Sequence, residues 1–140
     1  MLNLTLTHTA EYALRAMTAL AMKGDKLPVN ARDLAAETEI PVHYLNKIMR
    51  RLVDADFVIS SKGHGGGFKL GKAASRISYL DVLKVAGYDT EDKRCVFGRG
   101  GCDSNHPCPM HDSWSSLNNN FVVWARKTTL ASLKKSRQNM

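Results

Sequence analysis

The chain has 140 residues, which suffices for one domain with a single modest core. Its 20 Lys and Arg residues outnumber its 13 Asp and Glu residues, and the net charge of +7 favours an anionic partner. No apolar run approaches the roughly 18 residues that a membrane span needs, and the first residues lack the pattern of a leader. We therefore expect a cytoplasmic protein that does not enter the membrane.

The first part of the sequence predicts three helices. Apolar residues recur at helical spacing between positions 9 and 22, as on the buried face of a helix. Asn30 can cap a short second helix that carries Asp33 in its electropositive first turn. Pro41 suits the first turn of a third helix, where its missing N–H breaks no hydrogen bond.

A hairpin and two further helices follow. The runs "FVIS" and "FKL" flank a glycine-rich tip, which predicts a hairpin. Ser78 can cap a fourth helix that ends at Gly87. A last amphipathic helix carries a stripe of large apolar side chains, Trp114, Leu117, Phe121 and Trp124. The order of elements predicts a mainly α fold with a small β-hairpin, a winged helix-turn-helix.

The segment 31–48 fits a helix-turn-helix. Ala35 supplies the small residue that the contact between the two helices needs. The apolar residues that would lock both helices to the core are Leu34, Ile40, Leu45 and Ile48. Glu39 occupies the turn position where glycine is usual. By itself this pattern is equally typical of an ordinary helical hairpin.

Polar and basic residues line the outward face of the third helix. A recognition helix presents polar side chains to base edges near its N-terminus and basic side chains to phosphates further along. The candidates here are Val42, His43, Asn46 and Lys47, followed by Arg50 and Arg51. A solvated charged face is the alternative interpretation.

The hairpin tip, "KGHGGG", contains four glycines. Backbone without Cβ atoms can approach a narrow surface closely, and its amides can then bind phosphate oxygens. The tip matches neither the P-loop nor the dinucleotide fingerprint, and no helix is expected after it. We interpret it as a wing that contacts DNA through Lys62, His64, Gly65 and Gly66.

All three cysteines lie within fourteen residues. With the histidine that follows, the spacing is C-x6-C-x5-C-x2-H, through Cys95, Cys102, Cys108 and His111. An odd number of thiols cannot pair completely, and clustered thiols in a reducing compartment are more often metal ligands or redox groups. Thiolate and imidazole suit either zinc or an iron–sulfur cluster. The residues alone leave these two nearly level, with a redox disulfide third.

Four stretches together resemble a known family. They are "YALRAM", "IPVHYLNKIMRRL", "SSKGHGGGFKLGK" and the three-cysteine segment. They look like the Rrf-type winged-helix iron–sulfur transcriptional regulators, the family of IscR and NsrR. The resemblance implies a homodimer with a cluster as its sensor and DNA-reading positions at His43, Asn46, Lys47 and Lys62. The IscR pattern has an acidic residue at Asn46 and Arg at Lys62, so the preferred bases are expected to differ.

The resemblance also implies that the three cysteines hold an iron–sulfur cluster. IscR-like members add a histidine at the position of His111. NsrR-like members add a carboxylate from the first helix of the partner subunit, which corresponds to Glu11. We favour His111, which would give a 2Fe–2S cluster, whereas ligation by Glu11 would leave 4Fe–4S open. The signal would be redox state, nitric oxide or cluster supply.

The expected organisation has three parts. Residues 1–88 form the winged helix-turn-helix domain, 89–112 the cysteine-rich cluster loop, and 113–140 a dimerisation helix and tail. Cluster binding would order the loop and set the two domains of a dimer to fit a palindromic operator. The alternatives are a DNA-binding regulator with a structural zinc and a thiol-based redox protein. No nucleophile–base–orienter set is evident, so we expect no enzyme activity.

Overall fold

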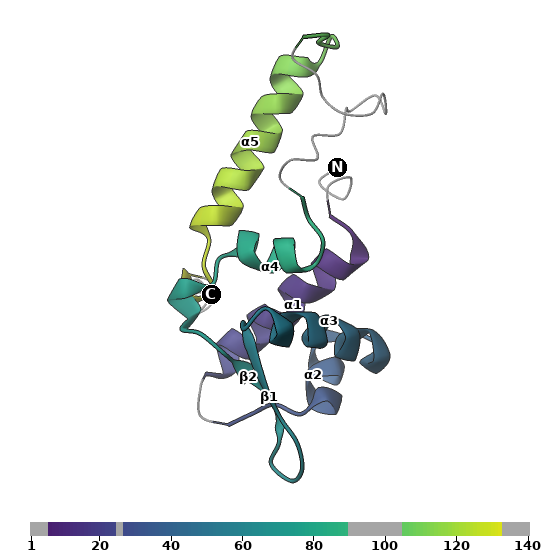
Figure 1. Cartoon of the computed structure of the whole chain (residues 1–140), viewed down its shortest axis with the longest axis vertical. Helices are drawn as coiled ribbons and strands as arrows, with labels where there is room; N and C mark the ends of the chain where they lie inside the picture. Colours follow the sequence, from purple (N-terminus) through teal and green to yellow (C-terminus); the bar gives the residue numbers. More distant parts are fainter. Residues whose placement is uncertain (1–5, 25–26, 90–104, 133–140) are drawn as a thin grey trace.

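The computed structural model describes residues 6–24, 27–89 and 105–132 (Figure 1). Helices dominate, and the one sheet of these residues has two antiparallel strands. The elements in chain order are α1 (His8–Lys23), α2 (Ala31–Thr38), α3 (Val42–Asp54), β1 (Val58–Ser61), β2 (Gly67–Leu70), the 3-10 helix η2 (Ala74–Arg76), α4 (Tyr79–Val85) and α5 (His111–Lys127). The mainly α fold with a small hairpin is therefore as expected, and η2 is an addition that the sequence did not predict.

Local hydrogen bonds fix where the helices begin. The Asp33 N–H donates to the Asn30 side chain at 2.8 Å, which confirms the predicted cap of α2. Ser78 and Asp81 form a reciprocal capping box at the start of α4. Pro41 lies one residue before α3, so the chain enters the helix without losing a backbone donor.

A third segment ties the hairpin to the helices. β1 and β2 pair with Val58 opposite Leu70. Val29, in the segment that leads into α2, exchanges two backbone hydrogen bonds of 2.8 Å with Phe68 of β2. A Cβ atom on Gly67 would lie 2.4 Å from the Val29 carbonyl oxygen, so this close approach requires glycine. The base of the hairpin is therefore fixed relative to α2.

One apolar core joins α1 to α4 with the base of the hairpin. α1 packs against α2, α3 and α4, and its buried alanines allow these helices to approach closely. The positions predicted to lock the helix-turn-helix are all buried: Leu34, Ala35, Ile40, Leu45 and Ile48. We call residues 6–24 and 27–89, which contain these elements, the head.

α5 extends away from the head in the direction opposite to the hairpin (Figure 1). It packs chiefly against α4, and only Phe121 and Ala125 of α5 are buried. The helix begins at His111, inside the range predicted as loop. Asp112 in its first turn suits the positive end of the helix dipole, which helps the helix to start there. Among the described residues, no helix combines the length and the apolar character needed to cross a membrane.

Backbone pairing anchors the C-terminal end of α5 to the head. The Tyr79 N–H donates to the Thr128 carbonyl at 2.8 Å, and the Leu130 N–H donates to the Ile77 carbonyl at 3.0 Å. Leu130 is fully buried. The helix is thus attached at one end, while its first turns extend beyond α4 (Figure 1).

Candidate DNA-binding surface and metal-binding segment

The predicted reading residues of α3 lie on one face of the helix. Leu45 and Leu52 on the opposite face are completely buried. The exposed set comprises Val42, His43, Asn46, Lys47, Arg50 and Arg51. α3 therefore separates the core from a face of polar and basic groups, which is the arrangement that a recognition helix needs.

The turn between α2 and α3 is built without glycine. Glu39 adopts left-handed backbone, with φ of 57° and ψ of 36°. The Ile40 N–H donates to the Ala35 carbonyl at 3.1 Å and closes the turn. The helix-turn-helix geometry therefore forms without glycine in the turn. Glu39 takes that place, although a residue with a Cβ atom tolerates left-handed backbone less well than glycine does.

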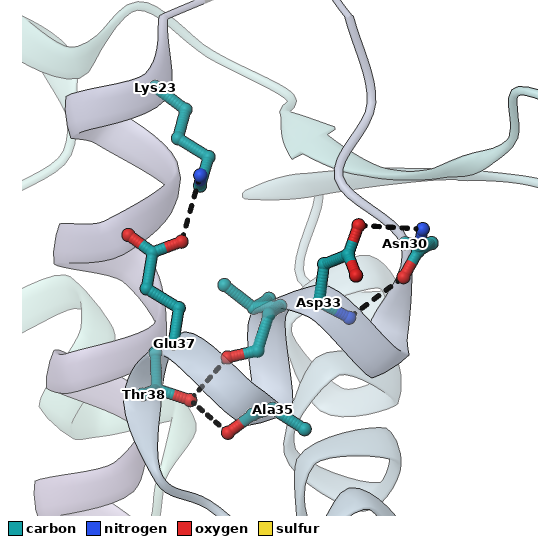
Figure 2. A network of polar contacts seen from close by, with 7 residues as sticks. Lys23, Asn30, Asp33, Ala35, Glu37 and Thr38 are labelled. Carbon is teal, nitrogen blue, oxygen red and sulfur yellow. Dashed lines mark hydrogen bonds and ion pairs between the residues drawn. The ribbon is translucent and has the colours of Figure 1, made fainter.

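Polar contacts hold α2 against α1 (Figure 2). Lys23 Nζ lies 2.8 Å from Glu37 Oε2 across the two helices. Within α2 itself, the buried hydroxyl of Thr38 donates to the Leu34 carbonyl at 2.6 Å and is thereby satisfied. The Arg15 guanidinium donates to the Thr38 carbonyl at 2.8 Å, so the last turn of α2 is bonded to α1. These contacts fix the end of α2, from which the turn leads into α3.

The hairpin tip presents the side chains that the sequence predicted for a wing. Lys62 and His64 are exposed at its end, and Figure 1 shows the hairpin projecting beyond the helices. Gly65 is exposed and has φ of 75°. The Gly66 N–H donates to the Gly63 carbonyl at 3.0 Å, so this amide already has a partner within the tip. Glycine is needed at this position by the turn itself, because a Cβ on Gly66 would lie 2.4 Å from the Ser61 carbonyl oxygen.

Tyr44, for which the sequence predicted no role, lies among the reading residues. Its ring centroid is 4.7 Å from that of His43, and Lys47 Nζ lies 6.0 Å from it. Tyr12 of α1 meets the same ring edge to face at 6.3 Å. The sequence does offer a signal, because Tyr44 stands three residues before Lys47 and such pairs share a helix face.

Two of the four favoured metal ligands lie within the described residues. Cys108 and His111 share one turn at the start of α5, where the His111 N–H donates to the Cys108 carbonyl at 3.0 Å. Both residues are half-buried, and Cys95 and Cys102 lie outside the described residues. No group of three or more potential ligands occurs in the part of the chain that the structure describes. A thiol and an imidazole three residues apart are donors that fit zinc or an iron–sulfur cluster.

Glu11, the alternative fourth ligand, lies in the first turn of α1. Its carboxylate Oε2 is 3.8 Å from His8 Nδ1, and its side chain is 37% exposed. A carboxylate in a first turn is also favoured by the helix dipole without any metal. The role of Glu11 as a ligand from a partner subunit stays a prediction.

The predicted dimerisation stripe divides into a packed part and an exposed part. Phe121 is buried, with its ring centroid 5.7 Å from that of Tyr88, whose pKa is raised by burial. Leu117 and Trp124 are 48% and 49% exposed, and Trp114 is half-buried. One part of the stripe therefore seats α5 on the head, and the other is exposed apolar surface.

Comparison with known families assigns the chain. The family described as Rrf2, iron-dependent transcriptional regulator, matches residues 6–136. The chain belongs to the Rrf2 family. The sequence-based recognition of this family is thereby confirmed, as is the expectation of a DNA-binding regulator rather than an enzyme.

Similar sequences include regulators named IscR. The HTH-type transcriptional regulator IscR of Escherichia coli O1:K1 / APEC is 32% identical over 128 residues, which cover 91% of this chain and 78% of that protein. IscR of Cronobacter sakazakii is 31% identical over the same shares of the two chains. The similarity thus extends over the head and α5 together.

Solved structures of Rrf2 regulators share the fold. CymR, the global cysteine regulator of B. subtilis, superposes with a TM-score of 0.80 at 21% identity, covering 94% of this chain and 96% of that one. T. potens IscR superposes with a TM-score of 0.75 at 20% identity, covering 96% and 88%. These likenesses confirm the winged-helix fold of this Rrf2 member.

Proposed function

We propose that this Rrf2 regulator binds a specific DNA operator with an affinity that an iron–sulfur cluster controls. The cluster would be held by Cys95, Cys102, Cys108 and His111. The observation that carries the proposal is the shared turn of Cys108 and His111 at the start of α5, a helix whose C-terminal end is bonded to the head. The iron dependence in the family's description and the similarity to IscR support it.

The proposed DNA contacts divide by chemistry. Asn46 can bond an adenine edge, and Lys47 can donate to guanine. Arg50 and Arg51 would neutralise phosphates along the backbone. The wing would add the remaining contacts through Lys62, His64, Gly65 and Gly66, with Val42 and His43 beside the bases at the start of α3.

The proposed assembly is a homodimer formed through α5. The exposed part of its stripe, which includes Leu117 and Trp124, leaves more apolar surface on one helix than a small monomer usually exposes. A twofold dimer would present two α3 helices to a palindromic operator. The site of action would be the cytoplasm, where DNA is found and thiols stay reduced.

Control would come from ordering of the ligand segment. Bound metal is coupled to folding because the ligands gain a fixed arrangement only when they bind it together. Cys108 and His111 would transmit that order to the first turn of α5, and the backbone bond from Tyr79 to Thr128 would carry it to α4. The two heads of the dimer would then be held at the separation that the operator requires.

Anaerobic purification of the parent protein tests the cofactor. We expect a coloured protein with visible absorption and equal counts of iron and acid-labile sulfide, and an operator affinity that changes when the cluster is removed. His111→Ala should shift the absorption spectrum and loosen the cluster, while Glu11→Ala should leave both as they are. The reverse result would assign the fourth ligand to Glu11.

The same experiment tests the alternatives. A colourless protein that contains zinc would contradict the sensing cluster and favour a structural zinc site instead. Equal DNA affinity of the loaded and the stripped protein would contradict the control that we propose, even if iron were present.

A further inference from the structure

The reading residues at the start of α3 share one aromatic ring. Tyr44 is 48% exposed, yet its ring has neighbours on several sides. The imidazole of His43 is tilted 41° to it with the centroids 4.7 Å apart, and Lys47 Nζ lies 6.0 Å from its centroid. Two of the predicted base-reading side chains, His43 and Lys47, therefore share the phenol ring as a neighbour.

The ring of Tyr44 is supported in turn by α1. Tyr12 meets it edge to face, with centroids 6.3 Å apart and planes at 64°, which is a favourable aromatic arrangement. Tyr12 itself is half-buried and packs against the core. The chain of contacts thus runs from the core through Tyr12 and Tyr44 to the outer face of α3.

Arg15 fixes the other side of Tyr12. The carbon of its guanidinium group lies 5.4 Å from the centroid of the Tyr12 ring, which is a cation–π geometry. The same guanidinium donates to the Thr38 carbonyl in the last turn of α2 at 2.8 Å. One arginine therefore links α2, which sets the angle of α3, to the aromatic pair that supports the side chains of α3.

Such support matters because base recognition depends on the direction in which a side chain offers its hydrogen bond to the base edge. A free lysine has about 2 kcal/mol of rotamer entropy to lose on ordering, and a hydrogen bond weakens steeply when its angle is poor. A cation over an aromatic face is already restricted to part of its rotamer space. Placement before binding would therefore favour one base over another without adding a contact to DNA.

We propose that Tyr44, supported by Tyr12 and Arg15, is a positioning residue for base recognition. It acts by holding the His43 and Lys47 side chains in the direction that their base contacts require. The inference rests on the proposed use of α3 to read DNA and extends it to residues that need not touch a base. A role in stability alone accounts poorly for Tyr44, since half of its side chain faces solvent.

The experiment separates the preference for one DNA sequence over another from the overall affinity for DNA. Duplexes are selected from a randomised library with the parent protein, and each variant is then measured on the best selected duplex and on a random-sequence duplex. The central variants are Tyr44→Leu, which removes the ring, and Tyr44→Phe, which keeps it. Lys47→Ala reports whether the reading residue itself matters, and a thermal melt is recorded for every variant.

We expect Tyr44→Leu to reduce the preference for the selected duplex about tenfold, which is within the range of one base contact. Binding to the random duplex and its salt dependence should stay the same, because no phosphate contact is lost. Tyr44→Phe should restore the preference, since the hydroxyl takes no part in the ring contacts. In NMR spectra, the imidazole proton signals of His43 should shift in Tyr44→Leu and not in Tyr44→Phe.

Arg15 gives a second test that preserves charge. Arg15→Lys keeps the positive charge but removes the planar group that stacks on Tyr12 and reaches Thr38. Arg32→Lys, at an exposed arginine of α2, is the matched control. We expect a loss of discrimination of a few-fold in Arg15→Lys and none in Arg32→Lys.

Three outcomes would overturn the proposal. Full discrimination in Tyr44→Leu, with Lys47→Ala impaired, would show that the ring positions nothing. An equal loss in Tyr44→Phe and Tyr44→Leu would assign the effect to a direct contact by the hydroxyl. Unchanged discrimination in Lys47→Ala would overturn the reading role of Lys47 and with it the positioning of that side chain, whereas the first two outcomes leave the reading role of Lys47 in place, so the two failures are distinguishable.

Discussion

The head and α5 cover their apolar side chains in different ways. In the head, Met17, Leu34 and Leu45 have no exposed surface, and the helices surround one core. Along α5 only Phe121 and Ala125 are buried. The head therefore has a core that its own helices enclose, whereas α5 is buried only at the two residues where it packs on the head.

This difference matches the division of chemistry along the chain. The proposed DNA contacts lie on α3 and the hairpin, which the core of the head holds in place. Two of the proposed metal ligands, Cys108 and His111, lie at the start of α5, away from the buried residues Phe121 and Ala125. The proposed control needs a DNA-reading surface of constant geometry and a second region whose arrangement changes with the bound metal. In this proposal the head supplies the first and α5 the second.

A change inside the head should have the largest effect. Leu45→Ala removes a completely buried side chain beneath the reading face and should lower the free energy of unfolding by about 2–5 kcal/mol. Urea denaturation followed by circular dichroism measures it. Leu27→Ala, at a leucine that is 77% exposed, is the matched control and should change stability by less than about 0.5 kcal/mol. Equal effects of the two changes would contradict the description of the core.

The junction between hairpin and helices should be nearly as sensitive. Gly67→Ala would place a Cβ 2.4 Å from the Val29 carbonyl oxygen and should cost about 2 kcal/mol or more. Gly24→Ala is the control, because φ there is also positive but no atom lies within 4 Å of the added Cβ. The control should therefore show only the strain of its backbone, which at φ of 80° and ψ of −172° is nearly restricted to glycine, about 1–3 kcal/mol, and Gly67→Ala should cost more than that. Thermal melts of both variants compare the two costs.

On α5 the effect should fall on association rather than folding. Leu117→Ala removes an exposed apolar side chain and should weaken the proposed dimer by about 1–2 kcal/mol. Sedimentation velocity over a range of concentrations measures the dissociation constant, and urea denaturation should leave the head unchanged. A parent chain that stays monomeric at every concentration would contradict the proposed role of α5.

A charge on the hairpin should matter only when DNA is present. Lys62→Ala should weaken operator binding by about 1 kcal/mol and reduce the slope of log affinity against log salt by about one unit. Lys84→Ala, at an exposed lysine of α4, is the control and should change neither. Identical salt slopes in the two variants would exclude a phosphate contact at Lys62.

The smallest effect is expected at the turn before α3, and it has the opposite sign. Glu39→Gly relieves a left-handed backbone that disfavours residues with a Cβ atom, and the gain should be about 0.5–1 kcal/mol after the entropy of glycine is subtracted. Asp56→Gly, at the second described residue other than glycine with positive φ, should behave alike. A loss of stability in both variants would show that these two side chains stabilise the fold by more than the left-handed backbone destabilises it.

Local features of the fold could be predicted because local chemistry determines them. Asn30 and Ser78 cap their helices through hydrogen bonds to residues three positions away, and the sequence shows both partners of each bond. The burial of Leu45 and Ile48 follows from helical periodicity alone. The exposure of Lys47 and its neighbours follows from the same periodicity, so the candidate surface of α3 was predictable as well.

Contacts between distant residues could not be predicted in the same way. The backbone pairing of Val29 with Phe68, and that of Tyr79 with Thr128, depends on how whole elements pack. The ring of Tyr44 joins His43 and Lys47 to α1 only because α1 and α3 cross where Tyr12 lies. Periodicity places each side chain on a face, but it does not specify which face of another helix it meets.

The attachment of α5 at one end makes it a lever. Its 17 residues span about 25 Å at 1.5 Å per residue, with the fulcrum at the backbone bridge between Ser78 and Thr129. A tilt of about 10° at that fulcrum would displace the far tip by about 4 Å on the same geometry. A displacement of less than 1 Å near the bridge would thus become a larger displacement at the start of α5, where His111 lies. Conversely, a movement at the start of α5 would produce a smaller one near the bridge.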